Sequence, residues 1–270
     1  MNFVEIEAQG LVLLGCGKMG SALLAGWLAG GLSPSAVYVI DPAPSEWLLG
    51  TGVRVNENLP TDPVMMIVAV KPQMMGEALP KISGFGGGGT VVLSIAAGTP
   101  IARFEDVFGA KTPVIRAMPN TPAAIGRGIT ALVGNAYADN DAVSLAETLL
   151  SAVGDTVRIS AEAQMDAVTA VSGSGPAYVF HLIETLAAAG AAHGLPYDLA
   201  ERLARATVAG AGALAEASDE DPAQLRVNVT SPGGTTQAAL EVLMDDETGF
   251  PALLAQAVGS AAKRSRELSE

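Results

Sequence analysis

The chain has little charge, few aromatic side chains and few of the residues that bind metals. Charged residues make up 16% of the 270 residues, and aromatic residues make up 4%. A single cysteine, Cys16, excludes an internal disulfide framework and fits a reducing compartment. The two histidines, His181 and His193, lie far from it in the sequence, so no metal-ligand spacing is present. We therefore predict a cytoplasmic protein without a bound metal.

Positive charge is also scarce, with 15 Lys and Arg against 28 Asp and Glu, which gives a net charge of −13. Nucleic acids and anionic membranes bind basic surfaces, so this balance argues against both as partners. The first nine residues carry Glu5 and Glu7 and no basic region, which is not the pattern of a signal peptide. Polar residues and a proline interrupt the weakly polar stretch 167–192, so it does not predict a transmembrane span.

Apolar residues, by contrast, are abundant. They make up 49% of the chain, and the mean hydropathy is +0.36. Residues 187–192 and 209–217 are apolar on nearly all sides, which is typical of a helix in a core or a tight subunit interface. Together with the low charge, this pattern predicts an obligate homo-oligomer rather than a membrane protein.

A glycine-rich motif near the N-terminus predicts a dinucleotide site. The apolar strand 11–14 leads into G-x-G-x-x-G, and an apolar helical pattern follows over 21–28. Gly15 makes the tight turn, Gly17 lets the backbone approach a pyrophosphate, and Gly20 lets the helix pack on the strand. The alternative is a strand–helix turn without a ligand. The predicted site comprises Gly15, Gly17, Lys18, Met19 and Gly20.

An acidic residue ends the second predicted strand. Strand 36–40 is followed by Asp41, where an acid usually accepts hydrogen bonds from the ribose 2′-hydroxyl and repels a 2′-phosphate. No Arg or Lys lies between Lys18 and Arg54 to offset that repulsion, so the pattern favours NADH over NADPH. The alternative is that Asp41 only begins a turn with Pro42.

Further strands predict the rest of a parallel sheet and place candidate residues at its edge. Their ranges are 63–70, 90–95, 114–117, 129–133 and 156–159, with a helix over 139–153. Lys71 is a candidate for catalysis, phosphate binding or simple solvation. Ala96 and Ala97 are small enough for a flat ring to lie against the backbone. Asn120 is a candidate either to bind a carboxamide or to cap its turn.

The second half of the sequence predicts helices only. Helical patterns cover 162–171, 177–193, 196–217, 222–228, 237–243 and 251–267, with an interruption at 172–176. We expect an α/β protein in which a Rossmann-like, doubly wound domain over 1–159 precedes an all-α dimerisation and substrate domain over 160–270.

The segment Val229-Thr-Ser-Pro-Gly-Gly-Thr-Thr236 lies between two of these helices. A helix should end before it and another begin inside it, and a helix N-terminus is a ready site for an anion such as a small carboxylate. The alternative is an ordinary helix cap after a turn.

The helical half lacks an obvious strong acid or base. The lysines are Lys18, Lys71, Lys81, Lys111 and Lys263, and none lies in this half before its last helix. The arrangement suits reduction of an imine, because a protonated imine is already an electrophile. The protein then needs only to hold it against a nicotinamide and exclude water.

Together these features resemble the pyrroline-5-carboxylate reductase family over nearly the whole chain. The segments that carry the resemblance are residues 15–20, 70–73, 94–98, 116–122, 172–177 and, above all, 229–236. The resemblance implies reduction of Δ1-pyrroline-5-carboxylate to L-proline, the last step of proline biosynthesis, by NADPH or NADH. It also implies a homodimer with interlocked helices, often assembled into a decamer, in which the second protomer's helical domain completes the site.

The resemblance also implies roles for individual residues. Ser231 and the loop Gly233, Gly234, Thr235 and Thr236 would hold the substrate carboxylate, and the Thr236 hydroxyl would meet the ring nitrogen. The residues expected to flank the cofactor are Val70, Lys71 and Pro72, with Ala96, Ala97 and Asn120 near the nicotinamide.

The sequence departs from the family pattern at two positions. Val227 stands where the family commonly has an acid, and Asp41 stands where many members have a neutral or basic residue suited to NADPH. Two rival functions remain. One is a 3-hydroxy acid reductase, which resembles a family that uses a lysine absent here. The other is a nucleotide sensor that has lost turnover.

Overall fold

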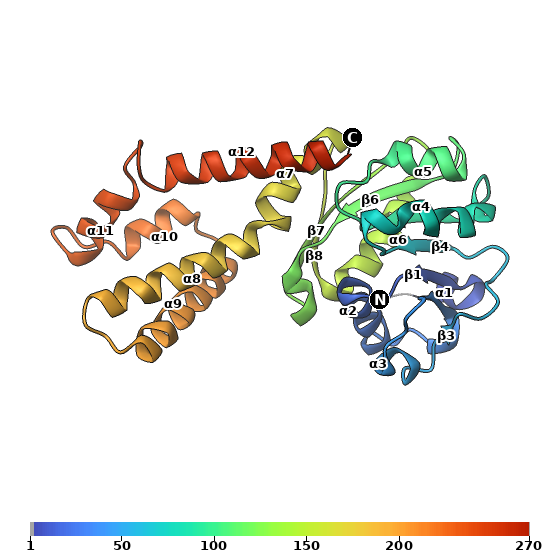
Figure 1. Cartoon of the computed structure of the whole chain (residues 1–270), viewed down its shortest axis with the longest axis horizontal. Coiled ribbons are helices and arrows are strands. Elements are labelled where there is room, and N and C mark those ends of the chain that lie inside the picture. The colour runs from blue at the N-terminus through green and yellow to red at the C-terminus, as the bar shows by residue number, and fades with distance from the viewer. Residues whose placement is uncertain (1–2, 270) are drawn as a thin grey trace. The chain divides into compact units, whose positions relative to one another are not determined.

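Eight strands form one sheet in the computed structural model, which describes residues 3–269 (Figure 1). The strands are β1 (Leu11–Leu14), β2 (Val37–Ile40), β3 (Arg54–Val55), β4 (Met65–Val68), β5 (Val91–Ser94), β6 (Val114–Met118), β7 (Gly128–Gly134) and β8 (Gly154–Arg158). Their order is β3-β2-β1-β4-β5-β6-β7-β8. All neighbours are parallel except β6 and β7, which are antiparallel. The predicted doubly wound, Rossmann-like sheet is confirmed.

The chain divides into two units by its internal contacts. Unit 1 comprises Met1–Gly173 together with Ala262–Glu270, and unit 2 comprises Ser174–Ala261. The predicted domain boundary at 159 and 160 lies earlier in the chain than this division. Residues 162–173 belong to unit 1 because they bond to and pack on it, as the contacts of Glu162 and the buried side chain of Met165 show.

Short helices surround the sheet in unit 1. They are α1 (Val4–Gln9), α2 (Lys18–Ala29), α3 (Glu46–Leu49), α4 (Met75–Ala78), α5 (Ile101–Phe108), α6 (Asn140–Leu150) and α7 (Met165–Val168). 3₁₀ segments cover Pro34–Ala36, Pro72–Met74, Leu79–Phe85, Thr121–Ile125, Ser151–Val153 and Glu162–Gln164. The predicted strands of this unit are confirmed to within a few residues. Helices α1, α3 and α5 and strand β3 were not predicted. Of these, α1, α3 and β3 are too short to show a period.

The sheet builds two hydrophobic clusters from alternate residues of the same strand. Leu11 and Leu13 of β1 join a cluster with Trp27 of α2, whereas Val12 joins one with Phe104 of α5. Successive side chains of a strand point to opposite faces, so a strand covered on both faces is apolar throughout. The Trp27 indole N–H donates to the carbonyl of Leu149 at 2.8 Å, and this bond connects α2 to α6.

A π-helical turn overlaps the first two residues of the predicted interruption at 172–176. Thr169–Gly173 is π-helical and runs on towards the next α-helix. A Cβ placed on Gly173 would lie 2.5 Å from the Cε atom of Met118 at the end of β6, so the glycine permits a close approach. Such π turns often occur at functional sites.

Unit 2 is helical. It contains α8 (Gly175–Ala192), α9 (Tyr197–Ala217), α10 (Pro222–Asn228), α11 (Thr235–Leu243) and the first part of α12 (Phe250–Ser269). Helices α8 and α9 approach closely where Gly190 faces Ala200, since a Cβ on the glycine would lie 3.3 Å from the Ala200 Cβ atom. The helices predicted for this part of the chain are confirmed.

Large apolar side chains of unit 2 remain exposed on the single chain. Phe180 is 63% exposed, Leu203 50% and Val242 69%. Apolar surface of this extent indicates a protein–protein contact and fits the predicted homo-oligomer. No helix within residues 3–269 is both long enough and apolar enough to cross a membrane.

Candidate active site

The predicted cofactor residues of unit 1 follow the carboxyl ends of β1, β2, β4, β5 and β6. These strands are mutually parallel, so their carboxyl ends lie along one edge of the sheet. The sheet order reverses at β1, which has β2 on one side and β4 on the other. Ligands of doubly wound sheets bind outside the carboxyl ends of the strands at such a switch point.

The glycine turn after β1 has a distinct geometry at each of its three glycines. Gly15 has a φ of +89°, and a Cβ there would lie 2.8 Å from the Cγ1 atom of Val70. A Cβ on Gly20 would lie 2.5 Å from the Gly15 carbonyl oxygen, so α2 packs directly on the turn. A Cβ on Gly17 would meet no protein atom within 4 Å. The backbone of Gly17 therefore faces open space that a side chain would fill, as a ligand cradle requires.

Asp41 is bonded to this glycine turn. Its Oδ2 atom accepts from the backbone N–H of Cys16 at 2.8 Å, and its Oδ1 atom accepts from the N–H of Ala43 at 2.8 Å. The bond to Ala43 makes the turn that the alternative interpretation of Asp41 expected. The bond to Cys16 places the carboxylate beside the glycine turn, as the ribose interpretation requires.

Asn56 holds Asp41 in place and was not predicted. Its side chain accepts from the Asp41 N–H at 3.0 Å and donates to the Asp41 carbonyl at 2.7 Å. Asn56 has a φ of +54°, a conformation that asparagine tolerates better than most residues. The short β3 strand positions it, and neither the strand nor the bond leaves a signal in the sequence.

The Cys16 thiol is unusually weakly acidic. Burial raises its pKa to about 11, and the negative charge of Asp41 adds to the effect because both disfavour the thiolate. We expect iodoacetamide at a pH of about 8 to alkylate Cys16 at least about tenfold more slowly in the folded protein than in urea, since the thiolate is the nucleophile. Equal rates in the two states, followed by mass spectrometry, would contradict this assignment.

The segments after β4 and β5 supply the remaining candidates of unit 1. Lys71 is exposed and precedes the 3₁₀ turn that Pro72 begins. Ala96 is buried and its N–H donates to the Ser94 hydroxyl at 3.3 Å, whereas Ala97 is exposed. The structure thus presents a small exposed side chain at the strand end, where a flat ring was expected to lie.

Asn120 has a structural bond. Its Oδ1 atom accepts from the backbone N–H of Ile129 at 3.0 Å, across the turn that joins β6 to β7. The side chain makes no capping bond to the following 3₁₀ segment, Thr121–Ile125. Asn120 therefore closes the antiparallel connection instead of capping the 3₁₀ segment, and its role at a carboxamide stays a prediction.

The loop before α11 has the predicted form. Helix α10 ends at Asn228, and α11 begins at Thr235 with Gly234 as its N-cap. Gly233 has a φ of +67°, in the left-handed region that favours glycine. The residues of this loop, 229–236, are exposed or half-buried in the single chain.

The loop was expected to hold the substrate carboxylate, but two of its backbone N–H groups already donate to acceptors within the protein. The Gly234 N–H donates to the Ser231 carbonyl at 3.0 Å, and the Gly233 N–H donates to the Gln237 Oε1 atom at 2.7 Å. Within residues 3–269, the N–H groups of Thr235 and Thr236 have no acceptor, which is the usual state of the first turn of a helix. The backbone N–H groups that this loop leaves free for the predicted anion therefore include those of the two threonines.

Comparisons with known proteins agree with these features. The family model for pyrroline-5-carboxylate reductase dimerisation matches residues 162–268, and the model described as NADP oxidoreductase, coenzyme F420-dependent, matches residues 11–98. The chain is 38% identical to the pyrroline-5-carboxylate reductase of Pseudomonas aeruginosa over 266 residues, or 96% of this chain and 97% of that protein. The chain belongs to the pyrroline-5-carboxylate reductase family. It is 40% identical to the Synechocystis enzyme over 267 residues, or 96% of this chain and 98% of that one.

Solved structures of the reductase family show the same fold. The pyrroline-5-carboxylate reductase of Coxiella burnetii superposes with a TM-score of 0.91 at 32% identity, over 97% of this chain and 99% of that one. The Plasmodium falciparum enzyme, solved with NADP bound, gives a TM-score of 0.82 at 28% identity, over 98% and 99% of the two chains. A nicotinamide dinucleotide is therefore the cofactor class of this reductase family.

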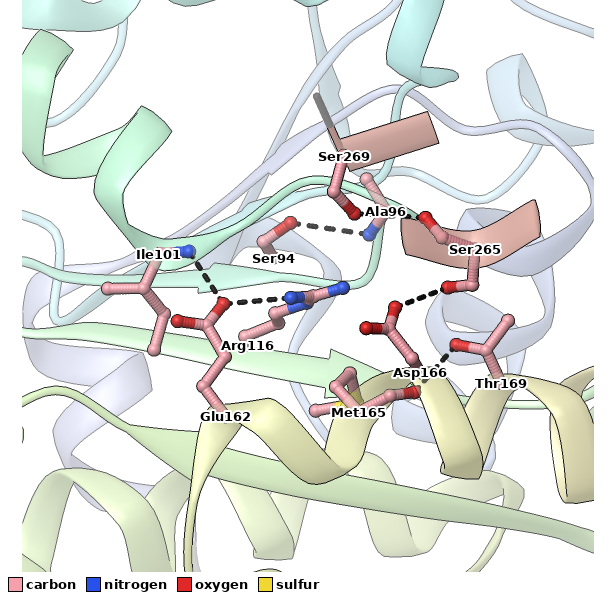
Figure 2. Close-up of polar contacts among 10 residues, drawn as sticks. All are labelled: Ser94, Ala96, Ile101, Arg116, Glu162, Met165, Asp166, Thr169, Ser265 and Ser269. Carbon is pink, nitrogen blue, oxygen red and sulfur yellow. Dashed lines mark hydrogen bonds and ion pairs between the residues drawn. The ribbon is translucent and has the colours of Figure 1, made fainter. Parts of the chain in front are cut away.

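Two polar contacts near the carboxyl end of β5 were not predicted from the sequence. Arg116 of β6 is paired with Glu162, and Asp166 is bonded to Ser265 of α12 (Figure 2). A charged residue inside an apolar strand signals that a partner exists, but the sequence does not say which residue it is. Within the described part of the chain, no three His, Cys, Asp or Glu side chains gather as a metal site.

Proposed function

We propose that this protein reduces Δ1-pyrroline-5-carboxylate to L-proline with a nicotinamide dinucleotide, in the last step of proline biosynthesis. The main support is the identity of 38% and 40% to reductases of that name over 96% of the chain. The open cradle at Gly17 and the two free amides at the start of α11 support the same activity from the chain's own geometry.

The substrate carboxylate binds at the N-terminus of α11. The N–H groups of Thr235 and Thr236 donate to it, and the Ser231 hydroxyl adds a third donor in the same loop. The positive end of the helix macrodipole favours the anion. Gly233 and Gly234 shape this loop, since Gly233 alone supplies the left-handed turn and the Gly234 N–H closes it on Ser231.

The Thr236 hydroxyl holds the ring nitrogen of the substrate. It makes no hydrogen bond to any residue that the structure describes, so it is available to a ligand. A protonated imine carries its own positive charge, and so the protein needs no strong acid there. Orientation against the hydride donor and exclusion of water supply most of the acceleration.

The cofactor, when bound, supplies a hydride to the imine carbon. Gly17 would face its pyrophosphate at the N-terminus of α2, where Gly15 makes the turn, Gly20 lets the helix pack on it, and Lys18 and Met19 form the first helical turn. The backbone of Val70, Lys71 and Pro72 borders it at the end of β4, and Ala96, Ala97 and Asn120 border its nicotinamide.

NADH is the preferred donor on electrostatic grounds. The Asp41 carboxylate lies beside the glycine turn, where it accepts from ribose hydroxyls and repels a 2′-phosphate. Arg54 is the next cationic residue along the chain after Lys18. It lies over the Tyr38 ring, and its guanidinium carbon is 5.0 Å from the ring centroid.

The active assembly is a homodimer, and a pentamer of such dimers is the larger form to test for. The exposed apolar side chains of unit 2 and the match to a dimerisation family support association of two chains. Light scattering of the purified protein separates a dimer from a decamer.

The deciding experiment follows the absorbance of the reduced nicotinamide with pyrroline-5-carboxylate and either NADH or NADPH. The expected results are rapid oxidation of the reduced nicotinamide by the cyclic imine and no reduction of NAD⁺ or NADP⁺ by a 3-hydroxy acid. Binding of cofactor without oxidation of either donor would overturn the proposal and favour the nucleotide sensor, with Val227 the first position to inspect.

Substitution at the glycine turn separates cofactor binding from folding. We expect Gly17→Ala to weaken NADH binding about tenfold, or about 1.4 kcal/mol, because the added Cβ fills the space of the pyrophosphate. Its melting temperature stays unchanged, since that Cβ touches no protein atom within 4 Å.

Gly20→Ala is the matched control for that variant. Its Cβ would lie 2.5 Å from the Gly15 carbonyl oxygen, so this substitution should lower the melting temperature as well as the affinity. Cofactor fluorescence and thermal unfolding measure both quantities. Unchanged NADH affinity in Gly17→Ala would remove Gly17 from the cofactor site.

A further inference from the structure

Two carboxylates one helical turn apart, Glu162 and Asp166, hold the segment that follows β5 (Figure 2). The Glu162 Oε1 atom accepts two hydrogen bonds, one from Arg116 Nη1 at 2.8 Å and one from the backbone N–H of Ile101 at 2.8 Å. Ile101 is the first residue of α5. Glu162 therefore fixes the point at which the β5–α5 connection ends.

Arg116 keeps Glu162 in this position. Its side chain is 6% exposed, and on the sheet Arg116 lies beside Ser94, the last residue of β5. A guanidinium with so little water around it requires its carboxylate partner, because an unpaired buried charge is strongly destabilising. The pair thus ties the β5–α5 connection to strand β6 of the sheet.

Asp166 holds the same connection through the last turns of α12. Its Oδ1 atom accepts from the Ser265 hydroxyl at 2.6 Å, and Ser265 is only 3% exposed. One turn further on, the Cβ atom of Leu268 lies 3.3 Å from the position a Cβ on Gly98 would take. Gly98 has a φ of +68°, so Leu268 packs on a backbone turn in the middle of the connection.

The held connection, residues 96–100, contains the exposed Ala97. It also borders a cavity of about 410 Å³ that Pro72, Gly98, Thr99, Arg103 and Leu268 help to line. Both the end and the middle of the connection are thus held by contacts with residues outside it.

We infer that Glu162 and Asp166 are positioning residues that set the place of the nicotinamide, through the residue 96–100 connection, while leaving the adenosine half of the cofactor unaffected. This inference rests on the proposed function, which puts the nicotinamide against Ala96 and Ala97. The adenosine half belongs to the glycine turn and Asp41, to which neither carboxylate is bonded.

The test compares two ligands on the same variants. ADP-ribose carries the adenosine and pyrophosphate groups of NADH but no nicotinamide. We expect Glu162→Ala and Ser265→Ala to bind ADP-ribose as the unmodified protein does, to raise the KM for NADH by about tenfold and to lower kcat by a similar factor, because a misplacement of about 1 Å costs up to about 10²-fold. Asp166→Asn should restore most of the activity that Asp166→Ala loses, since its amide oxygen still accepts from Ser265.

Glu147→Gln is the matched control. Glu147 of α6 forms an ion pair of comparable length, 2.6 Å, with Arg158 of β8. Loss of this pair should leave kcat and the affinities for ADP-ribose and NADH unchanged. A parallel loss of ADP-ribose and NADH affinity would overturn the inference and assign the carboxylates to general stability. Unchanged kinetics in Ser265→Ala and Asp166→Ala would overturn it as well. Lack of turnover by the unmodified enzyme would instead refute the proposed function, and the binding comparison would still decide the inference.

Discussion

Replacing Thr236 with alanine is expected to lower kcat by about 10²-fold, because a substrate misplaced by about 1 Å against the hydride donor loses up to about that factor. The hydroxyl is at the second residue of α11 and makes no hydrogen bond within residues 3–269. Its removal therefore leaves no buried group without a partner, and stability should change little. The lost contact is with the imine nitrogen, so the affinity for NADH should remain as it was.

Thr236→Ser is the control for this prediction, because it retains the hydroxyl and loses only a methyl group. It should keep kcat within a few-fold of the unmodified enzyme. Steady-state kinetics give kcat, and cofactor fluorescence gives the affinity for NADH. An equal loss of NADH affinity in Thr236→Ala would show that Thr236 is not a substrate residue. A serine variant as inactive as the alanine variant would assign the effect to packing rather than to the hydroxyl.

The sequence predicts those parts of the site that depend on neighbouring residues. The glycine turn is an example, since strand 11–14, the three glycines and the following helix occupy one continuous stretch. Each glycine then has the local geometry that its role requires. The loop before α11 is another example, because a glycine of positive φ and a helix start are both local properties.

The remaining parts depend on residues far apart in the chain. Glu162 bonds to Arg116 and Ile101 across separations of 46 and 61 residues, and Asp166 bonds to Ser265 across 99. Periodicity shows that each helix exists but does not show which turn of one helix meets another. The amide of Gly234 illustrates the same limit on a smaller scale, since its bond to the Ser231 carbonyl follows from how the turn closes.

The second large effect concerns Asp41, whose substitution should reverse the cofactor preference. Two like charges about 4 Å apart repel by about 1 kcal/mol in water and about 4 kcal/mol near a protein surface, which is about fivefold or more in affinity. We expect Asp41→Ser to raise the ratio of kcat/KM for NADPH to that for NADH at least about fivefold, by removing this repulsion of the 2′-phosphate. Steady-state kinetics with both cofactors measure the ratio.

Asp41→Asn separates the charge from the hydrogen bonds. Serine also removes the acceptor of the Cys16 N–H, which lies 2.8 Å from the carboxylate, and so changes the glycine turn itself. Asparagine keeps one acceptor oxygen without the charge. If the repulsion is the cause, both variants shift the ratio towards NADPH. A shift in the serine variant alone would trace the preference to the shape of the turn, and no shift in either would remove Asp41 from the ribose site.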